Sequence, residues 1–365
     1  MVILNSNFNL TLPEQEWTTA VYQYKLQTPE TLGIFKGTGR CSDEDEKEYV
    51  VLKMLVKPND PMLNNMISRF EAAKTLDKRL FILSQQILRD NQYIYFCYES
   101  FDHNLQTLME AVVNGDATED EWEMVVTGCI KALHHLHTTN ITHGHITPYN
   151  LVRKNGIGYL MGGVGDTFTP DLVWGQVQED DAFKHDVKRL VEAITTCIPP
   201  TMNAVEVNFL LKFLQRRQTM NRIQYHPYVQ SSTGVLALFV SAYDILDKDC
   251  NSTKGSFKIK VQNYLAIFSD VVKRNQYIGS LNWIARVPPN SVLQAVLKHR
   301  NGNYLENDVE LFRFWRNVFV HAVKRSQDNV QQHHDALYNM MTTIWPGFAH
   351  IVYEVIYDTR YGVFL

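Results

Sequence analysis

The chain has 365 residues, of which 45% are apolar and 20% charged, so it is long enough for two hydrophobic cores and is not disordered throughout. No apolar run approaches the roughly 20 residues of a membrane helix, and no signal peptide opens the chain. The net charge of −4 is uneven: residues 230–365 hold 14 Lys+Arg against 11 Asp+Glu, which is compatible with a polyanionic partner or with chance. The five cysteines lack CxxC spacing, which argues against a disulfide framework or a metal site and predicts a cytoplasmic location.

The first hundred residues carry strand signals. Short runs rich in β-branched and aromatic residues, separated by turn signals, predict strands at 20–26, 32–37, 48–55, 80–88 and 92–99. The run "PMLNNMISRFEAAKTLDK" at 61–78 has helical periodicity and opens on a proline, which favours the first turn of a helix. We therefore expect a small β-rich lobe at about 20–100, preceded by an N-terminal extension at 1–19.

The rest of the chain carries helix signals. Apolar residues at i, i+3 and i+4 predict helices at 104–113, 119–139, 183–197, 204–216, 234–247, 258–274, 290–299, 308–322, 328–343 and 347–357. The pattern changes near "YHPYV" at 225–229, which predicts the end of a helical lobe of about 101–229. The expected fold class is α+β, with a two-lobed unit at 20–229 followed by an all-α unit at 230–365.

Several motifs of residues 20–229 occur in the order found in protein kinases, and this part resembles a kinase domain. "VVLK" ends at Lys53, which matches the phosphate-contacting lysine, and Glu71 matches its partner glutamate on the next helix. "HGHITPYN" matches the catalytic loop and keeps its final Asn150, while Asp186 in "KHDVKRL" resembles the aspartate that braces this loop. The resemblance implies a bilobal, protein-kinase-like fold.

The groups that transfer phosphate in kinases are missing. His145 stands where the loop aspartate would accept the substrate proton, and "GGV" at 162–164 replaces the Asp-Phe-Gly that holds magnesium. Because phosphoryl transfer relies on positioned charge and metal, no kinase activity is expected. Lys53, Glu71 and Asn150 leave two interpretations open: a degenerate ATP or ADP site, or a structural ion pair between the lysine and the glutamate.

The segment "ELFRFWRNVFVHA" at 310–322 places Arg316, Asn317 and His321 within an apolar run. Histidine transfers protons near neutral pH and the planar fork of arginine fits phosphate oxygens, so these groups suit RNA cleavage by attack of the 2′-hydroxyl, without metal. The second interpretation is structural, because the apolar stripe has helical spacing and the polar groups would form its solvated edge. Five steps of about 100° separate Arg316 from His321, so a catalytic site predicts a break in the helix near residues 318–321.

Further motifs occur in the order found in the ribonuclease L and inositol-requiring-enzyme group, in which a kinase or pseudokinase domain is fused to a kinase-extension nuclease (KEN) domain. They are "HPYV" at 226–229, "LFVSAYDIL" at 238–246 with Asp244 at the acidic position, the Arg-Asn pair followed by histidine, and "WPGFAHIVYEVIYD" at 345–358. The chain resembles this group over about residues 20–357.

The resemblance to this group implies roles for individual residues. His321 would be the general acid–base residue, and Arg316 and Asn317 would bind the scissile phosphate. Tyr304 would be a further catalytic residue, although its position differs by about one residue from the expected spacing.

The resemblance also implies an activity and partners. We expect a metal-independent, RNase L-like endoribonuclease that cleaves single-stranded RNA without a cofactor, and a pseudokinase domain that serves as a dimerisation scaffold. The expected partners are RNA, a second copy of the chain through both domains, and an activating partner in place of a sensing module. The alternative is a non-enzymatic pseudokinase–KEN protein that pairs with or inhibits an active relative, or binds RNA.

Overall fold

The computed structural model of the chain describes residues 2–3, 8–11, 18–20, 32–41, 47–55, 76–89, 93–144, 146–161, 179–248, 255, 258–259, 282–299, 303–323 and 330–357. The chain divides into two compact units. Unit 1 comprises Met1–Met202 and Leu214–Asn221, and unit 2 comprises Asn203–Phe213 and Arg222–Leu365. Unit 2 therefore takes in most of a helix that the sequence assigned to the first domain, and its main segment begins before residue 230.

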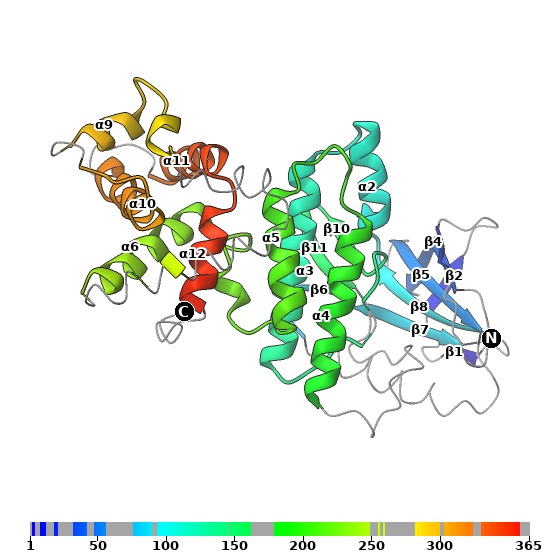
Figure 1. The fold of residues 1–365 in the computed structure, drawn as a ribbon. Helices are drawn as coiled ribbons and strands as arrows, with labels where there is room; N and C mark the ends of the chain where they lie inside the picture. The colour runs from blue at the N-terminus through cyan, green and yellow to red at the C-terminus, as the bar shows by residue number, and fades with distance from the viewer. Residues whose placement is uncertain are drawn as a thin grey trace. The chain divides into compact units, whose positions relative to one another are not determined.

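Unit 1 contains a large antiparallel sheet (Figure 1). Its strands run in the order β1-β7-β8-β5-β4-β2, with β3 also paired to β4. Their bounds are β1 Val2–Ile3, β2 Phe8–Thr11, β3 Thr18–Ala20, β4 Leu32–Cys41, β5 Lys47–Leu55, β7 Ser84–Arg89 and β8 Tyr93–Glu99. The side chains of Val50, Val51 and Phe96 are fully buried. Residues that the sequence set apart as an extension thus add strands, because β1 pairs with β7 and β2 with β4.

A second sheet of unit 1 has the order β6-β11-β10-β9. Its strands are β6 Phe81–Ile82, β9 His103–Asn104, β10 Leu151–Lys154 and β11 Ile157–Met161. The helices described within Met1–Met202 are α2 Leu105–Asn114, α3 Glu119–Thr138 and α4 Glu179–Thr196. A Cβ on Gly128 of α3 would lie 2.3 Å from the carbonyl oxygen of Gly158 on β11. Glycine at both positions therefore lets the helix lie directly on the strand.

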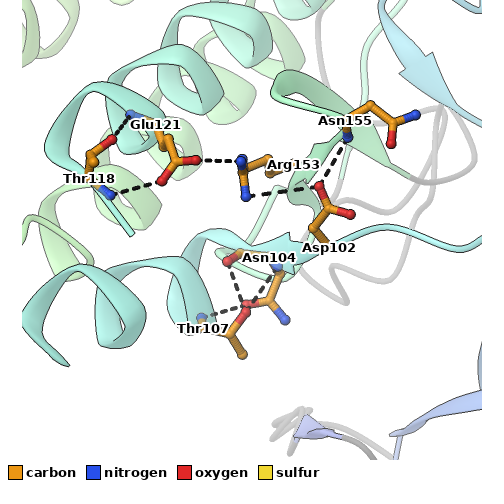
Figure 2. A network of polar contacts seen from close by, with 7 residues as sticks. All are labelled: Asp102, Asn104, Thr107, Thr118, Glu121, Arg153 and Asn155. Carbon is orange, nitrogen blue, oxygen red and sulfur yellow. Dashed lines mark hydrogen bonds and ion pairs between the residues drawn. The ribbon is translucent and has the colours of Figure 1, made fainter. Parts of the chain in front are cut away.

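Side chains of unit 1 fix where helices α2 and α3 begin (Figure 2). Thr118 and Glu121 form a reciprocal capping box at the start of α3, and Asn104 and Thr107 form another at α2. The carboxylate of Glu121 also bonds to the guanidinium of Arg153 on β10. The N-terminus of α3 is thus tied to the strand beneath it, a contact that the local sequence does not predict.

Helices make up the described part of unit 2. They are α5 Val205–Arg217, which extends beyond this unit, α6 Ser232–Lys248, α9 Val292–Lys298, α10 Asp308–Val323, α11 Val330–Ile344 and α12 Phe348–Tyr357, with short 3-10 helices at Ile223–Tyr225 and Ile284–Arg286. They agree with the predicted helices to within a few residues. The helix predicted at 61–78 lies mostly outside the described residues, as does most of the helix predicted at 258–274.

A chain of polar groups, fully buried at its two histidines, joins α5, α12 and the "HPYV" segment within unit 2. The Nδ1 atom of His226 accepts from the backbone amide of Tyr228 at 3.3 Å, and its Nε2 atom lies 3.5 Å from Nδ1 of His350. His350 in turn bonds through Nε2 to Glu206, whose other oxygen accepts from the amide of Gly347 at 3.2 Å. Because Nδ1 of His226 accepts a hydrogen bond, the neutral ring of His226 carries its proton on Nε2.

The buried chain alters the protonation of its members. Burial lowers the pKa of His226 well below its usual value, and repulsion from a charged His350 would lower it further. Burial raises the pKa of Glu206, but attraction to His350 and the bonds from His350 and Gly347 outweigh it and leave this pKa lowered. The "HPYV" histidine is therefore a core group of unit 2, held neutral between aromatic rings of Phe213 and Tyr353.

Candidate active site

Helix α10 carries the predicted site residues on the edge of a deeply buried face. The side chains of Leu311, Phe312, Trp315 and Val318 are buried, and the ring of Trp315 stacks on Phe239 of α6 with centroids 4.9 Å apart. The predicted site residues Arg316, Asn317 and His321 are half-buried and lie at the border of this face. The apolar stripe and the polar edge therefore coexist, and core packing fixes the orientation of the helix that bears the polar groups.

Hydrogen bonds join four side chains of unit 2 into one connected group. The guanidinium of Arg316 donates from Nη2 to Oδ1 of Asp244 on α6 and from Nη1 to Oδ1 of Asn317, each at 3.1 Å. The amide of Asn317 donates from Nδ2 to the phenol oxygen of Tyr304 at 2.8 Å. The structure thus brings together three residues that the sequence analysis selected, and it adds the carboxylate of Asp244 to them.

Aromatic packing holds Tyr304 in this group. Its ring meets Trp283 and Phe314 edge-on, with centroids 5.8 Å and 5.5 Å away, and the guanidinium of Arg313 lies 5.0 Å from its centroid. Trp283 is itself anchored, because its indole N–H donates to the carbonyl of Leu305 at 3.1 Å. The one-residue offset of Tyr304 in the sequence is therefore compatible with a place beside Asn317.

The helix break predicted near residues 318–321 is wrong, because α10 runs unbroken through Asp308–Val323. His321 lies one turn beyond Asn317 on the same face of this helix. Arg316 does not need a bend in the chain to reach that face, since its long side chain already folds across to the amide of Asn317. The flexible side chain of Arg316, rather than a change of backbone direction, brings its guanidinium to the face of α10 that carries Asn317 and His321.

A second histidine lies beside His321. The imidazole of His299, which follows the last turn of α9, has its centroid 5.3 Å from that of His321, with the ring planes at 55°. His299 is exposed and His321 is half-buried. Sequence reasoning missed His299 because the pairing is not local: only the packing of α9 against α10 brings the two rings together.

The kinase-like loop of unit 1 is braced by Asp186, as its position in the sequence predicted. The fully buried carboxylate accepts hydrogen bonds from the backbone amides of His143 and Gly144, each at 2.7 Å. The Nε2 atom of His137 on α3 lies 3.2 Å from the same carboxylate. His145, which stands where kinases have their loop aspartate, lies outside the described residues.

The residues of the suggested nucleotide site are described only in part. The Oδ1 atom of Asn150 accepts from the amide of Thr147 at 3.1 Å and from its hydroxyl at 2.7 Å, so this oxygen stabilises its own loop. Lys53 lies on β5, opposite Gly33 of β4 and Tyr95 of β8. Glu71 lies outside the described residues, as does the segment at 162–164, and the pairing of Glu71 with Lys53 stays a prediction.

Among the described residues, no group of three or more His, Cys, Asp or Glu side chains could hold a metal ion. None of the helices in this part of the chain is both long enough and apolar enough to cross a membrane.

The chain matches no family model and no curated protein. Among solved structures it is similar to the crystal structure of Rad53 1-466 in complex with AMP-PNP, with 12% sequence identity and a TM-score of 0.40, over 58% of this chain and 65% of that one. The match spans less than two thirds of that chain's length, and a likeness of this extent carries no conclusion about activity or ligand. The antiparallel sheet, the helices and the Asp186-braced loop of unit 1 fit a protein-kinase-like α+β fold.

Proposed function

We propose that this chain is a metal-independent endoribonuclease that cleaves single-stranded RNA with unit 2. The observation that carries the proposal is the connected group of Tyr304, Asn317 and Arg316, which lies one helical turn from His321. A guanidinium and an amide that suit a phosphate are thereby combined with an imidazole that suits proton transfer near neutral pH. The residues are half-buried, so core packing positions them while part of each stays exposed.

The proposed reaction uses the RNA's own 2′-hydroxyl as nucleophile. His321 takes the proton of this hydroxyl, the bond from O2′ to phosphorus forms, and the bond from phosphorus to O5′ breaks. The leaving oxygen takes up a proton, which gives a 2′,3′-cyclic phosphate and a 5′-hydroxyl. Arg316 has N–H donors beyond those that bond to Asp244 and Asn317, and these are available to stabilise the charge that develops on the phosphorane.

Unit 1 would serve as a scaffold rather than as an enzyme. The kinase loop aspartate is replaced by His145, and the metal-binding motif by "GGV" at 162–164. We propose that two copies pair around a twofold axis and that ATP or ADP binding, if retained, does not take part in RNA cleavage. Unpaired loops and ends are the expected RNA targets, because their bases are open to contact.

Cleavage of a fluorescent RNA hairpin in EDTA tests this proposal. The wild-type protein should cut in the loop and leave a 2′,3′-cyclic phosphate and a 5′-hydroxyl, and a 2′-deoxy substitution at the cut position should block the reaction. His135→Ala, which changes a half-buried histidine of unit 1, serves as the control and should cut at the wild-type rate. A requirement for Mg²⁺, or equal cleavage of the 2′-deoxy substrate, would contradict the mechanism.

The ion pair between Arg316 and Asp244 favours a second candidate function. A carboxylate beside the guanidinium competes with phosphate for the same donors, which suits a protein that has lost catalysis and pairs with or inhibits an active relative. This candidate predicts RNA binding, or binding to a catalytically active relative, with no cleavage in EDTA or in Mg²⁺. The hairpin assay therefore separates the two functions.

A further inference from the structure

Two imidazoles from different helices meet at the border of the candidate site. His299 is the residue that ends α9, and His321 lies in the last turns of α10; their ring centroids are 5.3 Å apart. Helix α9 is held by a cap at its start and by packing of its apolar side chains. The hydroxyl of Ser291 caps its start by accepting from the amide of Gln294 at 3.2 Å, and its side chains Leu293 and Val296 are buried.

The position of His299 is therefore set by folded structure and not by a free chain end. The backbone at His299 is extended, with φ −68° and ψ 132°, and its amide still donates to the carbonyl of Val296. The helical conformation therefore ends at His299, where the imidazole lies beside that of His321. Exposure then leaves the His299 ring open to a ligand that approaches from solvent.

RNA cleavage by the 2′-hydroxyl needs two proton transfers on opposite sides of one phosphorus atom. One removes the proton from O2′, and the other supplies a proton to the departing O5′. Each transfer group must come within about 2.6–3.2 Å of its oxygen, so a single imidazole does not serve both at once. The two imidazoles are in ring contact, with centroids 5.3 Å apart, so the two oxygens would lie beside the pair, each against a different ring.

We propose that His299 is the second proton-transfer group, which protonates the leaving 5′ oxygen while His321 removes the proton from the 2′-hydroxyl; this rests on the ribonuclease activity proposed above. His321 ends the step protonated and His299 ends it neutral, so protons and electron pairs balance. His299 is assigned to the leaving group because it is the exposed member of the pair. His321 is assigned to the nucleophile because it shares a helix face with the phosphate-binding Asn317.

A substrate with sulfur in place of the bridging 5′ oxygen tests this division of roles. A thiolate leaves without protonation, so loss of the acid is rescued by sulfur and loss of the base is not. In single-turnover assays of the full chain in EDTA, His299→Ala should cut the oxygen substrate about 10²-fold or more slowly than wild type. The same variant should cut the sulfur substrate within about tenfold of the wild-type rate.

Three comparisons make the result decisive. His299→Gln, which keeps a polar side chain of similar size, should behave as His299→Ala does, and His321→Ala should be slow on both substrates. Lys298→Ala removes the neighbouring exposed cation and should leave the ratio of sulfur to oxygen rates at its wild-type value. Circular dichroism of each variant checks folding.

Three outcomes would overturn the role proposed for His299, and a fourth would refute the ribonuclease activity itself. Wild-type cleavage of the oxygen substrate by His299→Ala would remove His299 from the chemistry while leaving the ribonuclease intact. Equal slowing of this variant on both substrates would make it a structural residue, and rescue of His321→Ala by sulfur would reverse the roles. No cleavage of either substrate by wild-type protein would instead refute the ribonuclease itself.

Discussion

The guanidinium of Arg316 on α10 lies 3.1 Å from the carboxylate of Asp244 on α6, and the side chains are 29% and 44% exposed. A partly exposed pair of this kind adds little to stability. Its value is positional, because Arg316 also donates to Asn317 and is thereby held across the polar edge of α10. The same carboxylate places a negative charge where a phosphate would bind.

The charge of Asp244 should weaken RNA binding. Asp244→Asn keeps an oxygen that accepts from Arg316 but removes the negative charge, so it should lower KM for RNA by roughly two- to fivefold, the range of exposed charge interactions. The difference in KM between the variant and the wild type should shrink as salt is raised from about 50 to about 300 mM, because salt screens exposed charges. Asp244→Ala, which lacks the acceptor, is the comparison and should lower kcat. An unchanged KM in Asp244→Asn would mean that phosphate does not approach this carboxylate.

The phenol of Tyr304 should act by holding Asn317. Tyr304→Phe keeps the ring contacts with Trp283 and Phe314 but leaves the Nδ2 donor of Asn317 without this acceptor. We expect a loss of about 1 kcal/mol in the free energy of unfolding and a fall in cleavage rate of up to about 10²-fold from misplacement of the amide. The exposed Tyr225 offers a matched control, since Tyr225→Phe should change neither quantity. Wild-type cleavage by Tyr304→Phe would exclude the phenol from the site.

Acid should destabilise unit 2 through His226. Its folded-state pKa lies well below 6.5 because burial disfavours the imidazolium, whereas in the unfolded chain it titrates near 6.5. Above about pH 7 this imidazole is neutral in both states, so it does not make the free energy of unfolding depend on pH. As the pH falls below about 6.5 the unfolded state binds a proton that the folded state does not, and stability falls by up to about 1.4 kcal/mol per pH unit.

The variant His226→Gln isolates this contribution, because glutamine bonds to its neighbours and does not titrate. Urea unfolding at pH 8, 7, 6 and 5, followed by hydrogen exchange in α12, should give a flatter dependence on pH for the variant than for the wild type. Burial also lowers the pKa of His185 in unit 1. Both proteins contain this histidine, so its contribution to the pH dependence is the same in each. Equal slopes for the two proteins would mean that folding leaves the pKa of His226 unchanged.

The brace of the kinase-like loop should be sensitive to the charge of Asp186. Asp186→Asn leaves one oxygen for the amides of His143 and Gly144, so one bond to a charged acceptor is lost, at a cost of about 1.5–3 kcal/mol. Hydrogen–deuterium exchange of these amides should become faster. Asp181→Asn, which alters an exposed pair with Lys184, is the control and should leave this exchange as in wild type. Unaltered exchange in Asp186→Asn would show that the loop is held by other contacts.

The helices could be predicted from the sequence because their signal is local. The apolar stripe of α10 and the caps of α3 are properties of neighbouring residues, and the structure has both elements within a few residues of the predicted bounds. The position of Asp186 could also be predicted, since the order of kinase-like motifs fixed its place. Arg316, Asn317 and Tyr304 were selected together by spacing and resemblance, and hydrogen bonds join them.

What the sequence analysis missed depends on contacts between distant segments. The pairing of β1 with β7 joins residues at opposite ends of the small lobe, and that of His299 with His321 depends on how α9 packs. The helix break was predicted from backbone geometry alone. It failed because the reach of the Arg316 side chain had been left out, and the conformation of this side chain depends on the partners that the fold supplies.

The most direct test of the central claim compares wild-type protein with His321→Ala on a fluorescent RNA hairpin in EDTA, over a series of protein concentrations. The wild type should cleave at a rate that rises faster than linearly with concentration, because paired copies act, and His321→Ala should be slower by at least about 10²-fold. Equal cleavage by the two proteins, or no cleavage by the wild type at any concentration, would contradict the assignment of this site to RNA cleavage.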